Sequence, residues 1–105
     1  MEGMDPVFKA LADANRRRLL DRLRAKNGQT LGELCERQIM SRQAVSKHLR
    51  ILERAQLVVT LRRGREKLHY LNPVPIHEIT ERWISEYDRR PLAALTELKK
   101  KLEER

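Results

Sequence analysis

The stretch that decides the fold is SRQAVSKHLRIL, residues 41–52. Ser41 is a residue type that caps the N-termini of helices, and the apolar residues Val45, Leu49 and Leu52 follow it at helical spacing. We therefore predict a helix over residues 41–55 whose apolar stripe faces the protein core. The opposite face is polar and basic, and it carries Arg42, Gln43, Ser46, Lys47, Arg50 and Arg54.

Two further helices are predicted at the N-terminus. Pro6 stands at a favourable first helical position and predicts a short helix over residues 6–11. Asp13 is a second N-cap residue type, and the Asn27-Gly28 pair is a strong stop signal. Together they frame a helix over residues 14–26.

Just before the 41–55 helix, the sequence predicts one more. Thr30 and Glu33 have the spacing of a capping box, in which each side chain satisfies a free backbone donor of the other residue. A helix begins there and runs to about Arg37 or Gln38. A short helix followed by a three-residue turn and a longer helix is the helix-turn-helix arrangement, whose second helix enters the major groove of DNA.

The spacing of the apolar residues changes after Leu57. Residues 58–63 and 67–71 are rich in β-branched and apolar residues, and Gly64-Arg65-Glu66 separates them. They predict a β-hairpin with a charged tip, closed by Asn72-Pro73 and Pro75. The predicted fold class is therefore mainly α with a small β-hairpin, a winged helix-turn-helix.

Length and composition favour one domain that pairs with a second copy. The chain has 105 residues, of which four are aromatic (Phe8, Tyr70, Trp83 and Tyr87). So few aromatic residues make a core completed by a partner plausible, and we predict a dimer. No apolar run reaches the length that crosses a bilayer and no signal peptide is visible, so a cytoplasmic protein without a membrane partner is expected.

The charge of the chain is concentrated in its middle. The net charge is +8, and residues 41–71 carry eight basic and two acidic side chains, so six of the excess charges lie there. Such a concentration points to a polyanion, with nucleic acid first and an anionic membrane surface second. We predict contacts with double-stranded DNA from Ser41, Arg42, Gln43, Ser46, Lys47, Arg50, Arg62, Arg63, Arg65 and Lys67.

Within this set the roles are expected to differ. Gln43 can pair bidentately with adenine and Arg42 with guanine, because the N-terminal end of a recognition helix lies deepest in the groove. The hairpin residues, such as Arg63 and Arg65, are placed for the DNA backbone or an adjacent minor groove. The alternative is a solvated basic surface with no ligand.

These segments also carry a family resemblance. LADANRRRLLDRL (11–23), TLGELCERQIMSRQAVSKHLRILERAQLV (30–58) and RRGREKLHYLNP (62–73) together resemble the ArsR/SmtB family of bacterial winged-helix repressors over about residues 6–73. The segment ERWISEYDRRPLAALTELKKKLEE (81–104) resembles the C-terminal helix of a subgroup without the metal-binding signatures. The resemblance implies a homodimer that binds a pseudo-palindromic operator and represses transcription.

The resemblance also assigns roles to parts of the chain. It places His48 at a near-constant histidine of the family, where a phosphate contact and a hydrogen bond to the backbone both stay open. It makes residues 6–73 a DNA-binding core and residues 74–105 the C-terminal dimerisation helices of a single domain, residues 1–105. The C-terminal segment returns to helical spacing, with Ile76, Ile79, Trp83 and Tyr87 on one apolar stripe and a run of leucines at helical spacing beyond Pro91. This stripe and the first and last helices of the family predict a dimer interface of Phe8, Leu11, Ile76, Ile79, Trp83, Tyr87, Leu95 and Leu98.

Other chemistry finds little support in the sequence. Metal-sensing members of the family that the chain resembles have a pair of closely spaced cysteines on the third helix, whereas this chain has the single Cys35, with Arg37 in place of the second. Among His77, Glu78 and Glu81, His77 and Glu81 could share a helix face, but two ligands are too few for a metal site. No cofactor and no enzymatic activity are predicted, and whether an effector exists stays unknown. The alternatives are an RNA-binding or protein-docking winged helix, or a metal- or redox-sensing repressor that uses Cys35.

Overall fold

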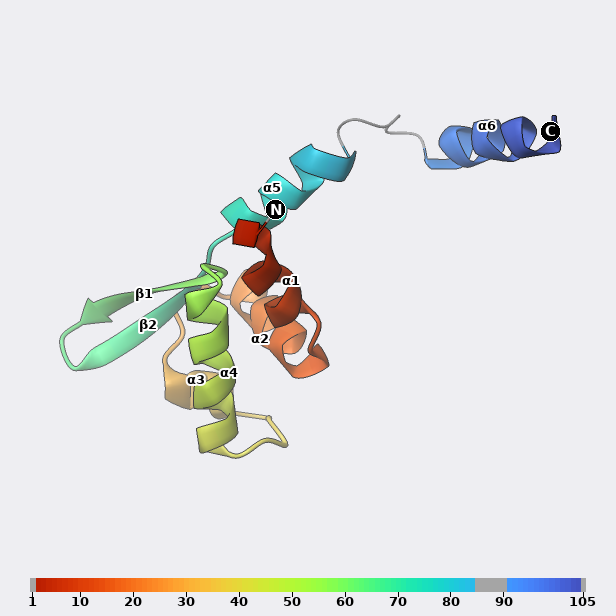
Figure 1. Ribbon diagram of the computed structural model, residues 1–105. Coiled ribbons are helices and arrows are strands. Elements are labelled where there is room, and N and C mark those ends of the chain that lie inside the picture. The colour runs from red at the N-terminus through yellow and green to blue at the C-terminus, as the bar shows by residue number, and fades with distance from the viewer. Residues whose placement is uncertain (1, 85–90, 105) are drawn as a thin grey trace. The chain divides into compact units, whose positions relative to one another are not determined.

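The computed structural model describes residues 2–84 and 91–104 of the chain (Figure 1). The chain divides into two compact units, Met1–Pro75 and Ile76–Arg105. The first unit holds most of the regular elements. They are a short 3-10 turn (Glu2–Met4), α1 (Asp5–Leu11), α2 (Ala14–Ala25), α3 (Leu31–Cys35), α4 (Arg42–Arg54), β1 (Val58–Arg63) and β2 (Glu66–Leu71).

The first unit confirms the predicted fold class of a mainly helical winged helix-turn-helix. α4 packs against α1, α2, α3 and β1, so it is the central helix of the unit. β1 and β2 form an antiparallel hairpin in which Val58 pairs with Leu71 and Arg63 pairs with Glu66. The hairpin extends beyond the helices in Figure 1 as the wing.

The predicted helix starts are present because their capping residues make the expected bonds. The Asp13 carboxylate accepts the backbone N–H groups of Asn15 and Arg16, at 2.8 and 3.1 Å. Thr30 and Glu33 form the reciprocal capping box at the start of α3. Each bond satisfies a donor that the first turn of a helix leaves free.

The core of the first unit is built from apolar side chains of the helices and of β1. Leu19 and Leu23 of α2, Leu34 of α3 and Leu52 of α4 are fully buried. Two polar residues, Gln29 and His69, are also buried, and they are hydrogen-bonded to each other's chain segments. Because the polar groups of both residues are hydrogen-bonded, their burial does not destabilise the fold.

α3 is shorter than the sequence predicted. It ends at Cys35, whereas the pattern predicted an end at Arg37 or Gln38 and a three-residue turn. Glu36 has extended backbone angles, and Arg37 adopts a left-handed conformation with φ of 62°. The turn before α4 is therefore longer than expected, because two residues that the sequence assigned to the helix form part of it.

The second unit begins within α5 (Val74–Ile79) and continues through a π-helical turn (Thr80–Ile84) and α6 (Pro91–Glu103). Pro75 was expected to help close the hairpin, but it lies buried in the first turn of α5. The α-helical spacing expected after Ile79 is replaced by the π turn. The Thr80 hydroxyl donates to the Ile76 carbonyl at 3.1 Å and so competes for the helix's own acceptor.

Candidate nucleic-acid interface

α4 presents its polar face because its apolar face is used by the core. Val45, Leu49 and Leu52 are buried, and the residues between them are exposed or half-buried. The Ser41 hydroxyl accepts the Ala44 N–H at 3.1 Å and fixes the start of the helix. Arg42, Gln43, Lys47 and Arg50 are exposed and Ser46 is half-buried, as the sequence predicted for the outward face.

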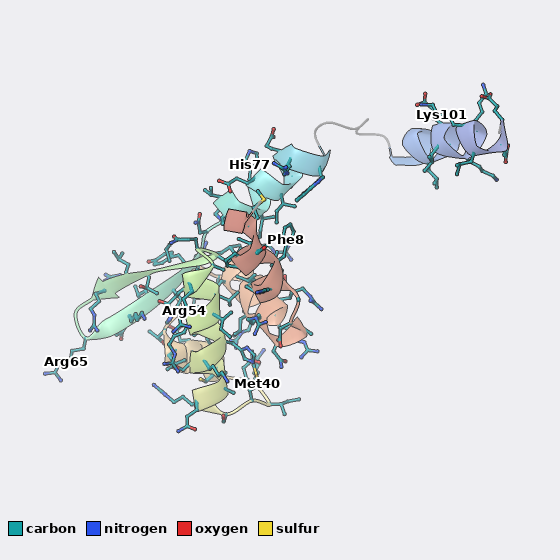
Figure 2. All side chains as sticks on the ribbon, viewed as in Figure 1. Phe8, Met40, Arg54, Arg65, His77 and Lys101 are labelled. Carbon is teal, nitrogen blue, oxygen red and sulfur yellow. The ribbon has the colours of Figure 1, made fainter. Side chains whose placement is uncertain are left out.

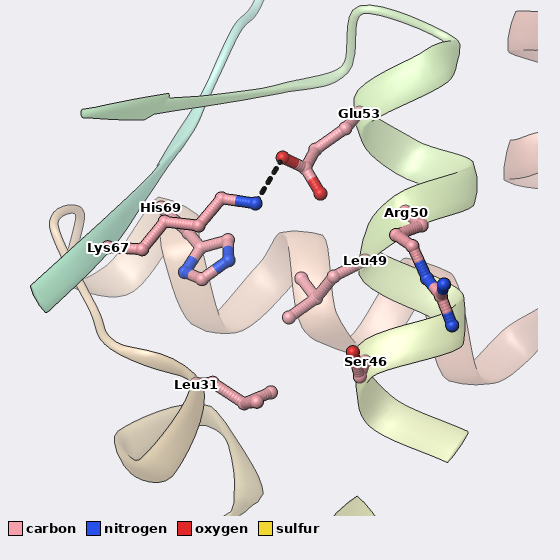
Figure 3. A pocket seen from close by; sticks show the side chains of 7 residues that line it. All are labelled: Leu31, Ser46, Leu49, Arg50, Glu53, Lys67 and His69. Carbon is pink, nitrogen blue, oxygen red and sulfur yellow. Dashed lines mark ion pairs between the residues drawn. The ribbon is translucent and has the colours of Figure 1, made fainter. Parts of the chain in front are cut away.

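A continuous concave surface lies between this face of α4, the start of α3 and the hairpin. Three adjoining hollows of about 340, 520 and 420 Å³ make it up, and Leu31 lines all three. Figure 3 shows the first hollow, where α4 faces Lys67 and His69 of β2. We call this surface the α4–hairpin groove. Thr30, Glu53 and Glu66 line it, and its basic and neutral polar lining from α4 and the hairpin consists of Arg42, Gln43, Ser46, Lys47, Arg50, Arg65, Lys67 and His69.

Seven of the residues predicted from the sequence meet in this groove, since all members of that lining except His69 belong to the prediction. Four lie outside it. Ser41 is exposed at the first turn of α4, Arg62 and Arg63 are exposed on β1, and His48 faces another part of the unit. Figure 2 shows Arg65 at the tip of the hairpin, where it points away from the helices.

His48 has a partner that the sequence did not suggest. Its Nδ1 lies 3.3 Å from the Arg16 guanidinium, whereas the predicted alternatives were a phosphate and the backbone. A guanidinium only donates, so Nδ1 is the acceptor in this contact. Arg16 also donates to the carbonyl oxygens of Lys9 and Ala10, at 3.0 and 2.8 Å, and thereby links the end of α1 to the middle of α4.

Arg22 explains the early end of α3. Its guanidinium donates to the carbonyl oxygens of Leu34 and Glu36, both at 2.7 Å, and of Glu33 at 2.9 Å. Carbonyl groups at the end of a helix lack partners within the helix, and a cation there also favours the helix dipole. Arg22 thus sets the turn that orients α4. The sequence shows no signal for this role, because Arg22 lies one helix away from its acceptors.

Two capping carboxylates carry lowered pKa values. The backbone N–H of Arg16 is the main cause that holds the pKa of Asp13 below its ordinary value, followed by the N–H of Asn15 and nearby positive charge. For Glu33 the main cause of the lowered pKa is the backbone N–H of Thr30, with the Thr30 hydroxyl and Lys26 adding to it. Both carboxylates are therefore ionised whenever the unit is folded at neutral pH.

The metal-sensing alternative gains no site from the part of the chain that the structure describes, and the redox alternative stays a hypothesis. Cys35 is a free, half-buried thiol. His77 Nε2 lies 3.7 Å from Glu81 Oε1, which is an ion-pair distance. Within residues 2–84 and 91–104, no group of three or more His, Cys, Asp or Glu side chains is placed to hold a metal ion. None of the helices in these ranges is both long and apolar enough to span a membrane.

The residues predicted for a dimer interface fall into three groups. Phe8, Ile76, Leu95 and Leu98 are exposed in the chain, with exposed fractions between 38 and 62%. Leu11, Ile79 and Trp83 are half-buried, and the Arg82 guanidinium lies 5.5 Å from the centre of the Trp83 ring. Tyr87 lies outside the described residues. The interface itself stays a prediction.

Comparisons with known proteins agree with this architecture. A helix-turn-helix domain family matches residues 11–60. The HTH-type transcriptional regulator YuzN of Bacillus subtilis is 41% identical, over 76% of this chain and 94% of the relative. An ArsR-like transcriptional regulator from Rhodococcus sp. RHA1 is 34% identical in sequence, covers 92% of each chain and superposes with a TM-score of 0.70.

The chain belongs to the ArsR-like family of winged helix-turn-helix transcriptional regulators. This confirms the resemblance to this family that the sequence carries over about residues 6–73. The transcriptional repressor SdpR of Bacillus subtilis is a further relative, 33% identical over 71% of this chain and 82% of its own length. As an ArsR-like regulator, the protein is a DNA-binding protein, and the α4–hairpin groove is its candidate interface with DNA.

Proposed function

We propose that this ArsR-like regulator is a cytoplasmic homodimeric repressor that binds a pseudo-palindromic operator. The observation that carries the proposal is the α4–hairpin groove, which brings Arg42, Lys47 and Arg50 of α4 onto one surface with Arg65 and Lys67 of the hairpin. A polyanion is the ligand that such a surface favours, and a duplex has a groove wide enough for α4. Repression is the role named for the relative SdpR.

In this proposal the two elements divide the work. Gln43 and Arg42, at the start of α4, contact base edges in the major groove, where amide and guanidinium side chains can pair bidentately. Ser46, Lys47 and Arg50 follow along the same face. Arg62, Arg63 and Arg65 of the hairpin contact phosphates, which supply affinity without sequence information.

The dimer is proposed on exposed apolar residues of α1, α5 and α6, together with the half-buried Trp83 of the turn that follows α5. Leu95 and Leu98 are more than half exposed in the chain, and Phe8 and Ile76 are exposed to 38% each. A second copy that covers these faces removes their apolar surface from water. Twofold symmetry of the protein then requires two half-sites in the operator.

The test is a selection of duplexes by the purified protein from a random pool, followed by sequencing. We expect an enriched sequence with twofold symmetry and half-sites about one helical turn apart. A single half-site without symmetry would contradict the dimer. A pool without enrichment would contradict sequence-specific recognition and favour an RNA-binding or protein-docking role. Binding to structured RNA in place of duplex DNA would then identify the RNA-binding role.

A further inference from the structure

One ion pair lies inside the α4–hairpin groove. Lys67 Nζ of β2 is 3.1 Å from Glu53 Oε1 of α4, and the side chains retain 47 and 23% of their exposure. Figure 3 shows the pair crossing the hollow between the helix and the strand. Lys67 was predicted as a DNA contact, yet its charge is already engaged by a carboxylate of its own chain.

The strand that carries Lys67 is held firmly at its base. The backbone N–H of His69 donates to the Gln29 carbonyl at 2.8 Å, and the Gly28 N–H donates to the His69 carbonyl at 2.9 Å. The ring of His69 adds a further bond, because its Nδ1 donates to the same Gln29 carbonyl at 2.9 Å. Lys67 lies two residues away on the same face of β2. It can therefore exchange partners by rotating its side chain alone.

Glu53 is placed where a carboxylate opposes DNA binding. It lines the hollow together with Ser46 and Arg50, next to the residues proposed to contact DNA. Binding of DNA without regard to sequence depends on the number of cations free to replace counterions on phosphate. A carboxylate in this position weakens such binding in two ways. Its own negative charge repels phosphate, and its ion pair with Lys67 removes one free cation.

We propose that Glu53 limits the affinity of the protein for DNA of any sequence by keeping Lys67 in an ion pair and away from phosphate. The inference rests on the proposed DNA-binding function and assigns Glu53 a role in its specificity. Specific recognition depends on the difference between two affinities, and a repulsive group that lowers the background serves it as well as an added attractive contact does. Lys67 then counts as a masked cation, in contrast to Arg63 or Arg65.

The test measures binding of full-length variants to a scrambled duplex over a range of salt concentrations. Glu53→Gln removes the charge while it keeps the size of the side chain. We expect affinity for the scrambled duplex to rise about three- to tenfold at 0.1 M salt, and the slope of log affinity against log salt to steepen by about 0.9 per protomer. These changes correspond to one additional phosphate contact in each chain.

Matched variants separate the release of Lys67 from a general charge effect. Glu53→Asp keeps the charge but withdraws the carboxylate by one methylene, so part of the gain should appear. Glu66→Gln removes the same charge from the hairpin, where the described structure gives Glu66 no ion pair, and its gain should be smaller. In a Lys67→Gln background, Glu53→Gln should lose most of its effect.

Several results would overturn the inference. They are a Glu53→Asp variant that binds like the wild type, a Glu53→Gln variant that gains no more than Glu66→Gln, or a gain that survives in the Lys67→Gln background. Thermal unfolding of each variant identifies any that do not fold. If Glu53→Gln does not fold, Glu53→Asp still tests whether Glu53 limits binding to scrambled DNA. A wild-type protein that binds no duplex would instead contradict the proposed function.

Discussion

α4 and α6 both carry apolar residues at helical spacing, but those of α4 are buried and those of α6 are exposed. Leu49 and Leu52 of α4 are 2 and 0% exposed, whereas Leu95, Leu98 and Leu102 of α6 are 54 to 62% exposed. The spacing of leucines therefore shows that a helix has an apolar face, and it does not show what covers that face. In α4 the cover is the core of the first unit, and for α6 we propose a second copy of the chain.

The first prediction compares these two faces directly. Leu52→Ala should lower the free energy of unfolding by about 2–5 kcal/mol, because it leaves a cavity in a packed core. Leu98→Ala in α6 should leave the unfolding midpoint nearly unchanged in dilute protein and should weaken self-association. Chemical unfolding at several protein concentrations, with sedimentation of the same samples, measures both effects. If both variants lost the same free energy of unfolding at every protein concentration, the proposed difference between α4 and α6 would be contradicted.

The second prediction concerns the face of α4 that the core leaves exposed. Gln43→Ala should cost about 1–3 kcal/mol on the selected operator and little on scrambled DNA, because a bidentate base contact is lost. Arg63→Ala on β1 should weaken both duplexes and reduce the salt slope by about 0.9 per protomer. Titrations of both duplexes at several salt concentrations check this. If Gln43→Ala lowers both affinities equally while Arg63→Ala affects only the operator, the hairpin reads the sequence and α4 does not.

Much of the fold could be predicted from local sequence. Asp13, Ser41 and the pair Thr30 and Glu33 act as caps within three residues of their partners, so their chemistry is visible in the sequence itself. The hairpin was visible from its change of period and from Gly64, which adopts a φ of 64° at the turn. Both kinds of signal depend on residues that are neighbours in the chain.

Contacts between distant residues could not be predicted in this way. The guanidinium of Arg22 ends α3, and Arg16 meets His48 across 32 positions of the sequence. The pairing of Lys67 with Glu53 was equally hidden, so a residue predicted as a free cation is already engaged in the folded chain. The groove residues that belong to α4 were predicted correctly as its outward face, and they are exposed except for the half-buried Ser46. Their contact with DNA stays a prediction.

The third prediction uses pH and applies to the first unit, where helix starts depend on carboxylates. Because the pKa values of Asp13 and Glu33 are lowered in the folded state, their stabilising contribution is complete above about pH 5 and is lost as the pH falls through their folded-state pKa values. Thermal unfolding from pH 7 to pH 3 should therefore show a falling midpoint.

A matched variant isolates the Asp13 contribution. Asp13→Asn keeps a side chain that caps well but cannot ionise, so the fall below pH 5 should be shallower than in the wild type. Asp13→Ala removes the cap itself and should cost about 1 kcal/mol at neutral pH. Identical acid profiles for the wild type and Asp13→Asn would show that this carboxylate does not contribute to the pH dependence.

The central claim is that two chains bind one operator, with α4 on the DNA and α6 between the copies. Sedimentation of the protein with a duplex that carries the whole selected site, and with one that carries a single half-site, tests it most directly. We expect two chains on the whole site, and for Leu98→Glu a loss of affinity on the whole site with no loss on the half-site. One chain on the whole site, or equal affinity of the wild type for both duplexes, would contradict it.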